Sequence, residues 1–154
     1  MPRGARVRSD MATFLLKTEP GEFSIDALER ESKKKPVRWD GITNAAALKA
    51  LREAKAGDEA FVYHTGDERA IVGLARITTD AYPDPKNPGV TVAGETKNPV
   101  VDIAFAKRAK TSVTLDAIKA DKRFAAFALV KQSRLSAMLV PPELARVLRQ
   151  MAGV

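Results

Sequence analysis

Short apolar segments, separated by turns and helices, constrain the fold of this chain more than any other feature. Five of them have the length and composition of β-strands, and they cover residues 12–17, 59–64, 70–79, 100–110 and 133–139. The predicted helices do not alternate with these strands in the regular order of a parallel sheet. We therefore expect an α+β domain with a mixed, curved sheet of about five to six strands and flanking helices.

Capping residues locate the helices between the strands. Ser24 and Thr114 are predicted N-caps, because each directly precedes a segment that we expect to be helical. Asn44 is predicted to cap an alanine-rich helix that ends at Gly57. Pro142 is predicted to open the last helix, since proline is common at the first helical position.

The length of 154 residues suits one domain, which we expect to cover residues 12–152. Residues 1–11 are expected to form a disordered basic tail. Residues 80–99 contain four prolines and two glycines, so they predict a long loop of the kind that is usually functional or mobile.

Charge and composition limit the classes of partner and site. The net charge of +7 favours a polyanionic partner such as nucleic acid. The lack of cysteine excludes disulfides and thiolate metal sites, and the single histidine, His64, excludes sites that need two imidazoles. Because no glycine-rich phosphate loop occurs, we expect no cofactor. No apolar run is long enough to cross a membrane, and no apolar run follows the basic N-terminus, so we expect neither a membrane span nor a signal peptide. We expect the protein to be cytoplasmic and monomeric.

Six short motifs carry a resemblance to a known family. In chain order they are LLKTEP, WDGITN, FVYHTG, VGLARI, DAYPDP and KQSRLSAM. Together they resemble the EVE domain family, which belongs to the PUA-like group with the YTH readers of methylated RNA and includes the thymocyte nuclear proteins. The resemblance covers roughly residues 12 to 152. It implies a PUA-like pseudobarrel whose pocket accepts one flipped-out, modified base of DNA or RNA.

Trp39 is the only tryptophan of the chain, and its neighbours are those of a polar turn. Arg38 precedes it and Asp40 and Gly41 follow it, so we expect the ring to form one wall of a base pocket at a turn. Stacking of a base on such a ring contributes about 1–3 kcal/mol. On this interpretation Trp39→Ala abolishes base binding with little loss of fold. The alternative is an ordinary core tryptophan.

The other predicted ligand-binding groups lie at strand ends, in the turn after Trp39, at the start of a helix and on the last strand. They are Lys17, Thr18, Glu19, Asp40, Asn44, Tyr63, His64, Arg134 and Ser136. Arg134 and Ser136 are expected on one face of a strand, with Leu135 packing inward. Each group also has a structural interpretation, such as a helix cap for Asn44 or a satisfied core histidine for His64. The candidates for phosphate contact are Arg38, Lys107, Arg108 and Lys131.

Two positions depart from the usual pattern of the family. Thr18 stands where relatives usually carry serine, which keeps the hydroxyl and adds a methyl group that narrows the pocket. Thr43 stands where relatives commonly carry arginine, which removes a positive charge beside the expected site. Both changes leave open which ligand is accepted and how closely its phosphate is held.

The sequence therefore predicts a reader domain that holds a single, methylated base of nucleic acid in an aromatic and polar pocket. The first alternative is a small-molecule or protein-interaction sensing domain that uses the same pocket. The second is an enzyme that acts on nucleic acid or a nucleotide, with His64 and either Asp40 or Glu19 as acid–base groups. We expect no enzyme, because the sequence contains no metal cluster, catalytic cysteine or paired-carboxylate motif.

Overall fold

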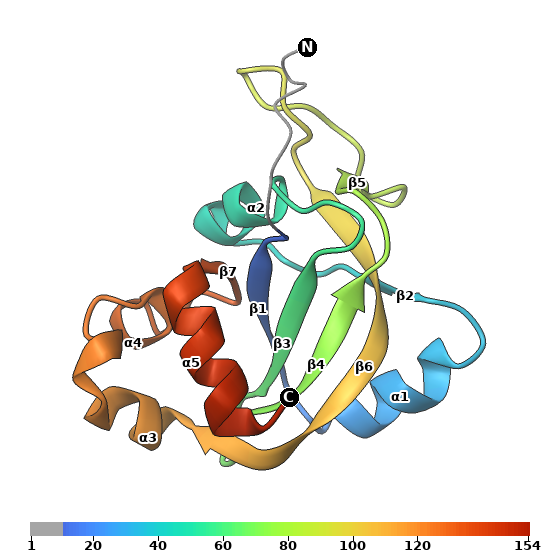
Figure 1. The fold of residues 1–154 in the computed structure, drawn as a ribbon. Helices are drawn as coiled ribbons and strands as arrows, with labels where there is room; N and C mark the ends of the chain where they lie inside the picture. The colour runs from blue at the N-terminus through green and yellow to red at the C-terminus, as the bar shows by residue number, and fades with distance from the viewer. Residues whose placement is uncertain (1–10) are drawn as a thin grey trace.

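A curled, mixed β-sheet with helices around it forms the centre of the chain (Figure 1), as seen in a computed structural model that describes residues 11–154. Most of the predicted tail therefore lies outside the described residues. Within them the sheet has seven strands in the order β2-β6-β4-β3-β1-β7, with β5 pairing with β6. Their bounds are Thr13–Thr18 (β1), Val37–Trp39 (β2), Glu59–His64 (β3), Ala70–Ile77 (β4), Tyr82–Pro83 (β5), Pro99–Thr114 (β6) and Ala137–Val140 (β7). The predicted α+β class with a mixed, curved sheet is confirmed.

Strand β1 lies between β3, with which it pairs in parallel, and the edge strand β7, with which it pairs antiparallel. Residues 13–16 of β1 are buried without interruption, so both faces of the strand are covered, which explains the continuous apolar run in the sequence. The parallel pairing requires a crossover, and residues 19–58 provide it with two helices and β2. Phe23, near the start of this crossover, packs against Trp39 at the end of β2.

Helices lie around the sheet (Figure 1), and the four for which the sequence predicts a start begin there. Ser24, Asn44 and Thr114 each accept a hydrogen bond from a backbone N–H of the first helical turn, as predicted. The helices are Ile25–Ser32 (α1), Ala45–Leu51 (α2), Leu115–Ala120 (α3), Ala128–Lys131 (α4) and Pro142–Ala152 (α5), with a 3₁₀ turn at Lys122–Phe124. Between residues 11 and 154, none of them has the length and apolar character that crossing a bilayer requires.

Helix α2 ends at Leu51, and the prediction that it runs to Gly57 is wrong. The buried carboxylate of Asp58 accepts hydrogen bonds from the backbone N–H groups of Lys55 and Ala12, at 2.8 and 3.0 Å. A side chain that binds nearby backbone groups in this way competes with the helical pattern. Gly57 instead adopts a φ of +98° in the turn that leads into β3.

Three strands, β7, β2 and β5, differ from the prediction. Strand β7 begins at Ala137, so residues 133–136 precede it in a turn, and the prediction that Arg134 and Ser136 share a strand face is wrong. Strands β2 and β5 lie in segments that we expected to be turn and loop. Both are extended because they pair with the long strand β6. The rest of the predicted loop projects from the end of the sheet (Figure 1), and the guanidinium of Arg52 donates to the carbonyls of Thr96 and Lys97 in it.

Candidate functional site

A cavity of about 520 Å³ opens between the end of β1, the segment that leads into α1, and β2 with its following turn. Its volume is in the range typical of small-molecule sites. The residues that line it are Lys17, Thr18, Glu19, Glu22, Phe23, Val37, Arg38, Trp39, Asp40, Gly41, Ile42 and Ser136. Many of the predicted ligand-binding residues are therefore brought together around one cavity.

Trp39 lines this cavity together with a second aromatic residue, Phe23, and it is also part of the hydrophobic core. It is the last residue of β2, pairs with Val101 of β6 and is 8% exposed. Its ring meets that of Phe23 edge to face, with centroids 5.9 Å apart and an angle of 68° between the planes. The polar turn begins only after it, at Asp40 and Gly41, where Gly41 has a φ of +82°. The prediction that Trp39 itself lies in a turn is wrong, and its burial in the core leads us to expect that its removal destabilises the fold.

The end of β1 supplies polar groups to the opposite side of the cavity. The ammonium of Lys17 donates to the carbonyl of Ser133 at 3.0 Å and lies 5.6 Å from the ring centroid of Tyr63. Partial burial lowers the pKa of Lys17. The hydroxyl of Thr18 donates to the carbonyl of Phe23 at 2.7 Å, which fixes the segment that carries this aromatic ring.

The charges around the cavity are mixed. Lys17 and Arg38 are its two cations, and Glu19, Glu22 and Asp40 are its three carboxylates. Such a lining offers both hydrogen-bond donors and acceptors, which suits the polar edge of a nucleobase. A site for several phosphates would instead be expected to collect cations.

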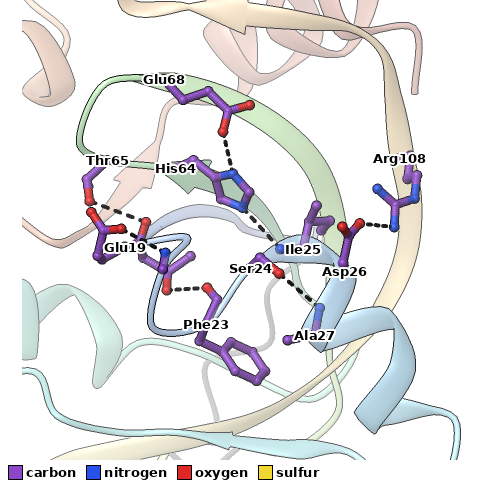
Figure 2. A network of polar contacts seen from close by, with 12 residues as sticks. Glu19, Phe23, Ser24, Ile25, Asp26, Ala27, His64, Thr65, Glu68 and Arg108 are labelled. Atoms are coloured by element: carbon purple, nitrogen blue, oxygen red, sulfur yellow. Dashed lines mark hydrogen bonds and ion pairs between the residues drawn. The ribbon is translucent and has the colours of Figure 1, made fainter.

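His64 does not line the cavity but ties α1 to the β3–β4 hairpin (Figure 2). Its Nε2 accepts a hydrogen bond from the backbone N–H of Ile25 at 3.0 Å, and its Nδ1 lies 2.7 Å from Oε1 of Glu68. Since Nε2 is an acceptor, the proton of the neutral ring is on Nδ1 and is donated to Glu68. Both ring nitrogens thus have partners within the fold. Tyr63, which is 3% exposed, is likewise outside the lining and belongs to the core.

Asn44 and most of the predicted cations lie outside the cavity lining. Asn44 accepts hydrogen bonds from two backbone N–H groups of α2 as its N-cap. Arg108 forms ion pairs with Asp26 and Glu29 of α1. Lys107, Lys131 and Arg134 are exposed and do not line the cavity. Among the candidates for phosphate contact, Arg38 is the one that lines it.

Sequence reasoning missed several lining groups, above all Phe23 and Glu22. Both follow directly after Thr18, Glu19 and two turn residues, so an aromatic residue just beyond the first strand was the available signal. Within residues 11–154 no group of three or more His, Cys, Asp or Glu side chains is placed to hold a metal ion.

Comparison with known proteins gives consistent matches. The family model of the EVE domain matches residues 12–151. Thymocyte nuclear protein 1 of Rattus norvegicus is 34% identical over 124 residues, which make up 69% of this chain and 54% of that protein. The chain therefore spans about half the length of the curated relatives that it matches.

Solved structures agree with the family match. The NMR structure of Rpa0253 from Rhodopseudomonas palustris has 38% identity and a TM-score of 0.81, and the match covers 93% of this chain and 94% of that one. The crystal structure of human THYN1 in complex with 5-methylcytosine containing DNA has 26% identity and a TM-score of 0.80, with 94% and 99% covered. These neighbours confirm the predicted PUA-like fold. As the six sequence motifs predicted, the chain belongs to the EVE domain family.

Proposed function

We propose that this chain is a nucleic-acid-binding reader domain that holds a single methylated base in the cavity beside Trp39. The observation that carries the proposal is a cavity of about 520 Å³ that combines an aromatic wall with mixed donors and acceptors. The proposal is supported by the relation to human THYN1, whose structure contains 5-methylcytosine DNA. Cytosine methylated at C5 is therefore the first ligand to test.

The cavity offers each kind of contact that a base needs. The Trp39 ring provides a surface for stacking, which contributes about 1–3 kcal/mol per base. A carboxylate of Glu19, Glu22 or Asp40 can accept from the exocyclic amino group of cytosine. The ammonium of Lys17 and the hydroxyl of Ser136 are donors for the carbonyl side of the base.

Two free-energy contributions determine how strongly a methylated base should be preferred over its parent base, and a single strand over a duplex. Burying the methyl group contributes about 0.8 kcal/mol, or roughly a fourfold difference in affinity. Extracting the base from a duplex costs a few kcal/mol. A single strand is therefore expected to bind more tightly than a duplex of the same sequence.

A small-molecule or protein-interaction role is the second candidate. It is favoured by the excess of carboxylates over cations among the lining residues, which suits a ligand that carries amino groups. An acid–base enzyme is less well supported, because the ring of His64 is engaged by Ile25 and Glu68 and does not line the cavity.

Titration of Trp39 fluorescence with short single strands tests the proposal. One position of the strand carries cytosine, 5-methylcytosine, adenine or N6-methyladenine, in DNA and in RNA. Trp39 is the only tryptophan, so the signal comes from the cavity wall alone. We expect quenching by the 5-methylcytosine strand at roughly fourfold lower concentration than by its parent. No quenching by any strand at low salt would refute nucleic-acid binding and favour the second candidate.

A further inference from the structure

Arg38 and Asp102 lie directly opposite each other on neighbouring antiparallel strands, β2 and β6. Opposite charges at such a pair of positions normally attract each other across the strands. In the described part of the chain these two do not form an ion pair. The hydroxyl of Tyr82 donates to Oδ1 of Asp102 at 2.6 Å, and its oxygen accepts from Nε of Arg38 at 3.3 Å. Tyr82 thus stands between the two charges.

The Asp102 end of this chain of contacts is held rigidly. The hydroxyl of Thr78 donates to the carbonyl of Asp102 at 3.1 Å, and the backbone N–H of Asp102 donates to the hydroxyl of Thr79 at 3.1 Å. Tyr82 is fixed by the short strand β5, in which it pairs with Val100. Burial and the hydrogen bond to Asp102 both raise the pKa of Tyr82, so the hydroxyl stays protonated and remains a donor.

This arrangement leaves most of the guanidinium of Arg38 available. Among residues 11–154, the guanidinium of Arg38 has one hydrogen-bond partner, the oxygen of Tyr82 at Nε, so the four N–H donors of the two terminal amino groups remain. Arg38 is exposed and lines the cavity beside Trp39. A planar guanidinium with both terminal groups available binds a phosphate through two parallel hydrogen bonds.

We propose that Tyr82 is a positioning residue: by occupying the carboxylate of Asp102, it keeps the guanidinium of Arg38 at the rim of the cavity. There Arg38 binds the backbone phosphate of the nucleotide whose base enters. Without the hydroxyl of Tyr82, Arg38 pairs with Asp102 and withdraws from the cavity. In this way the DAYPDP motif, which contains Tyr82, affects ligand binding indirectly, by positioning Arg38. The inference rests on the proposed function, because the phosphate belongs to the strand that is read.

The test uses the full chain and a fluorescently labelled single strand of DNA with one 5-methylcytosine, with affinity measured by anisotropy at several salt concentrations. Tyr82→Phe is expected to weaken binding about tenfold, as for loss of one hydrogen bond to a charged group. It should also lower the slope of log Kd against log salt by about 0.7, the value for one phosphate contact on a single strand.

Two double variants separate positioning from a structural role. In Tyr82→Phe/Asp102→Asn the carboxylate that attracts Arg38 is gone, so the affinity and salt slope of the parent chain should return. In an Arg38→Gln background, Tyr82→Phe should have no further effect on affinity. Arg146→Gln, which removes an exposed cation of helix α5 outside the cavity lining, is the matched control and should leave the affinity unchanged.

Tyr82→Phe/Asp102→Asn would overturn the inference if it did not recover the affinity of the parent chain and if both it and Tyr82→Phe had a lowered melting temperature. NMR of the ligand-free protein provides a second readout, the Nε–H signal of Arg38. This signal should change in Tyr82→Phe, and an unchanged signal would also overturn the inference. If the parent chain binds no strand, the proposed function fails, and the Nε–H signal still decides whether Tyr82 orients Arg38.

Discussion

Replacing Trp39 tests whether one side chain is both a core residue and a wall of the cavity. Its ring is 8% exposed and packs edge to face on Phe23, so Trp39→Ala removes core packing. Such truncations destabilise by about 3–5 kcal/mol, which for a chain of this size lowers the melting temperature by roughly 6–20 °C. Loss of stacking weakens base binding by a further 1–3 kcal/mol or so, about 5- to 150-fold in Kd.

The two effects are separated by matched variants. Trp39→Phe keeps an aromatic face, so it should retain more affinity and more stability than Trp39→Ala. Phe124→Ala is the control for general destabilisation, because Phe124 is fully buried and does not line the cavity. It should lower the melting temperature by a similar amount and leave Kd unchanged.

Affinity is measured by anisotropy of a labelled 5-methylcytosine strand, below the melting temperature of the least stable variant. Circular dichroism confirms that each variant is folded at that temperature. A folded Trp39→Ala protein with the affinity of the parent chain would refute the stacking role. An equal loss of affinity in Phe124→Ala would show that the effect on binding comes from destabilisation.

Three further predictions follow from individual contacts. His64→Leu leaves the buried N–H of Ile25 without an acceptor, so it should destabilise by about 1–3 kcal/mol in urea unfolding and leave strand affinity unchanged. Asn44→Ala removes a helix cap and should lower the free energy of unfolding by about 1 kcal/mol, whereas Asn44→Asp keeps a capping oxygen and should be largely neutral. A loss of strand affinity in Asn44→Ala without a loss of stability would instead place Asn44 at the ligand. Hydrogen bonds from Arg123 lower the pKa of Asp121 to about 2. The contribution of this exposed pair to stability is therefore present above the ordinary aspartate pKa, near 4, and is lost as pH falls toward 2. Asp121→Asn should make the melting temperature less dependent on pH within that window and leave its pH dependence elsewhere unchanged.

Much of the fold follows from local sequence signals. The caps at Ser24, Asn44 and Thr114 were predictable because the cap and its partner N–H lie within three residues of each other. The end of α2 was not, since it depends on the carboxylate of Asp58, which also binds a backbone group 46 residues away. Strands β2 and β5 were missed for a related reason: their conformation depends on pairing with β6.

The candidate site divides in the same way. Lys17, Thr18 and Glu19 were predictable as a group, because they are consecutive where β1 ends. Glu68 lies only four residues from His64, but the other partners are distant in sequence: Ile25 lies 39 residues from His64, and the two acids of α1 lie 79 and 82 residues from Arg108. No pattern in the sequence shows that these groups already have partners in the fold. The structural interpretations of both side chains depend on those long-range contacts.

The polar surroundings of Trp39 are explained by the geometry of β2. Side chains alternate between the two faces of a strand, so Arg38 and Asp40 are exposed while Trp39 between them is buried. Their adjacency in sequence therefore suggested a turn, although the three residues face different environments. Because β2 is an edge strand that ends at Trp39, residues from both of its faces reach the same cavity. One short strand thus supplies both the aromatic wall and, through Tyr82, the oriented cation.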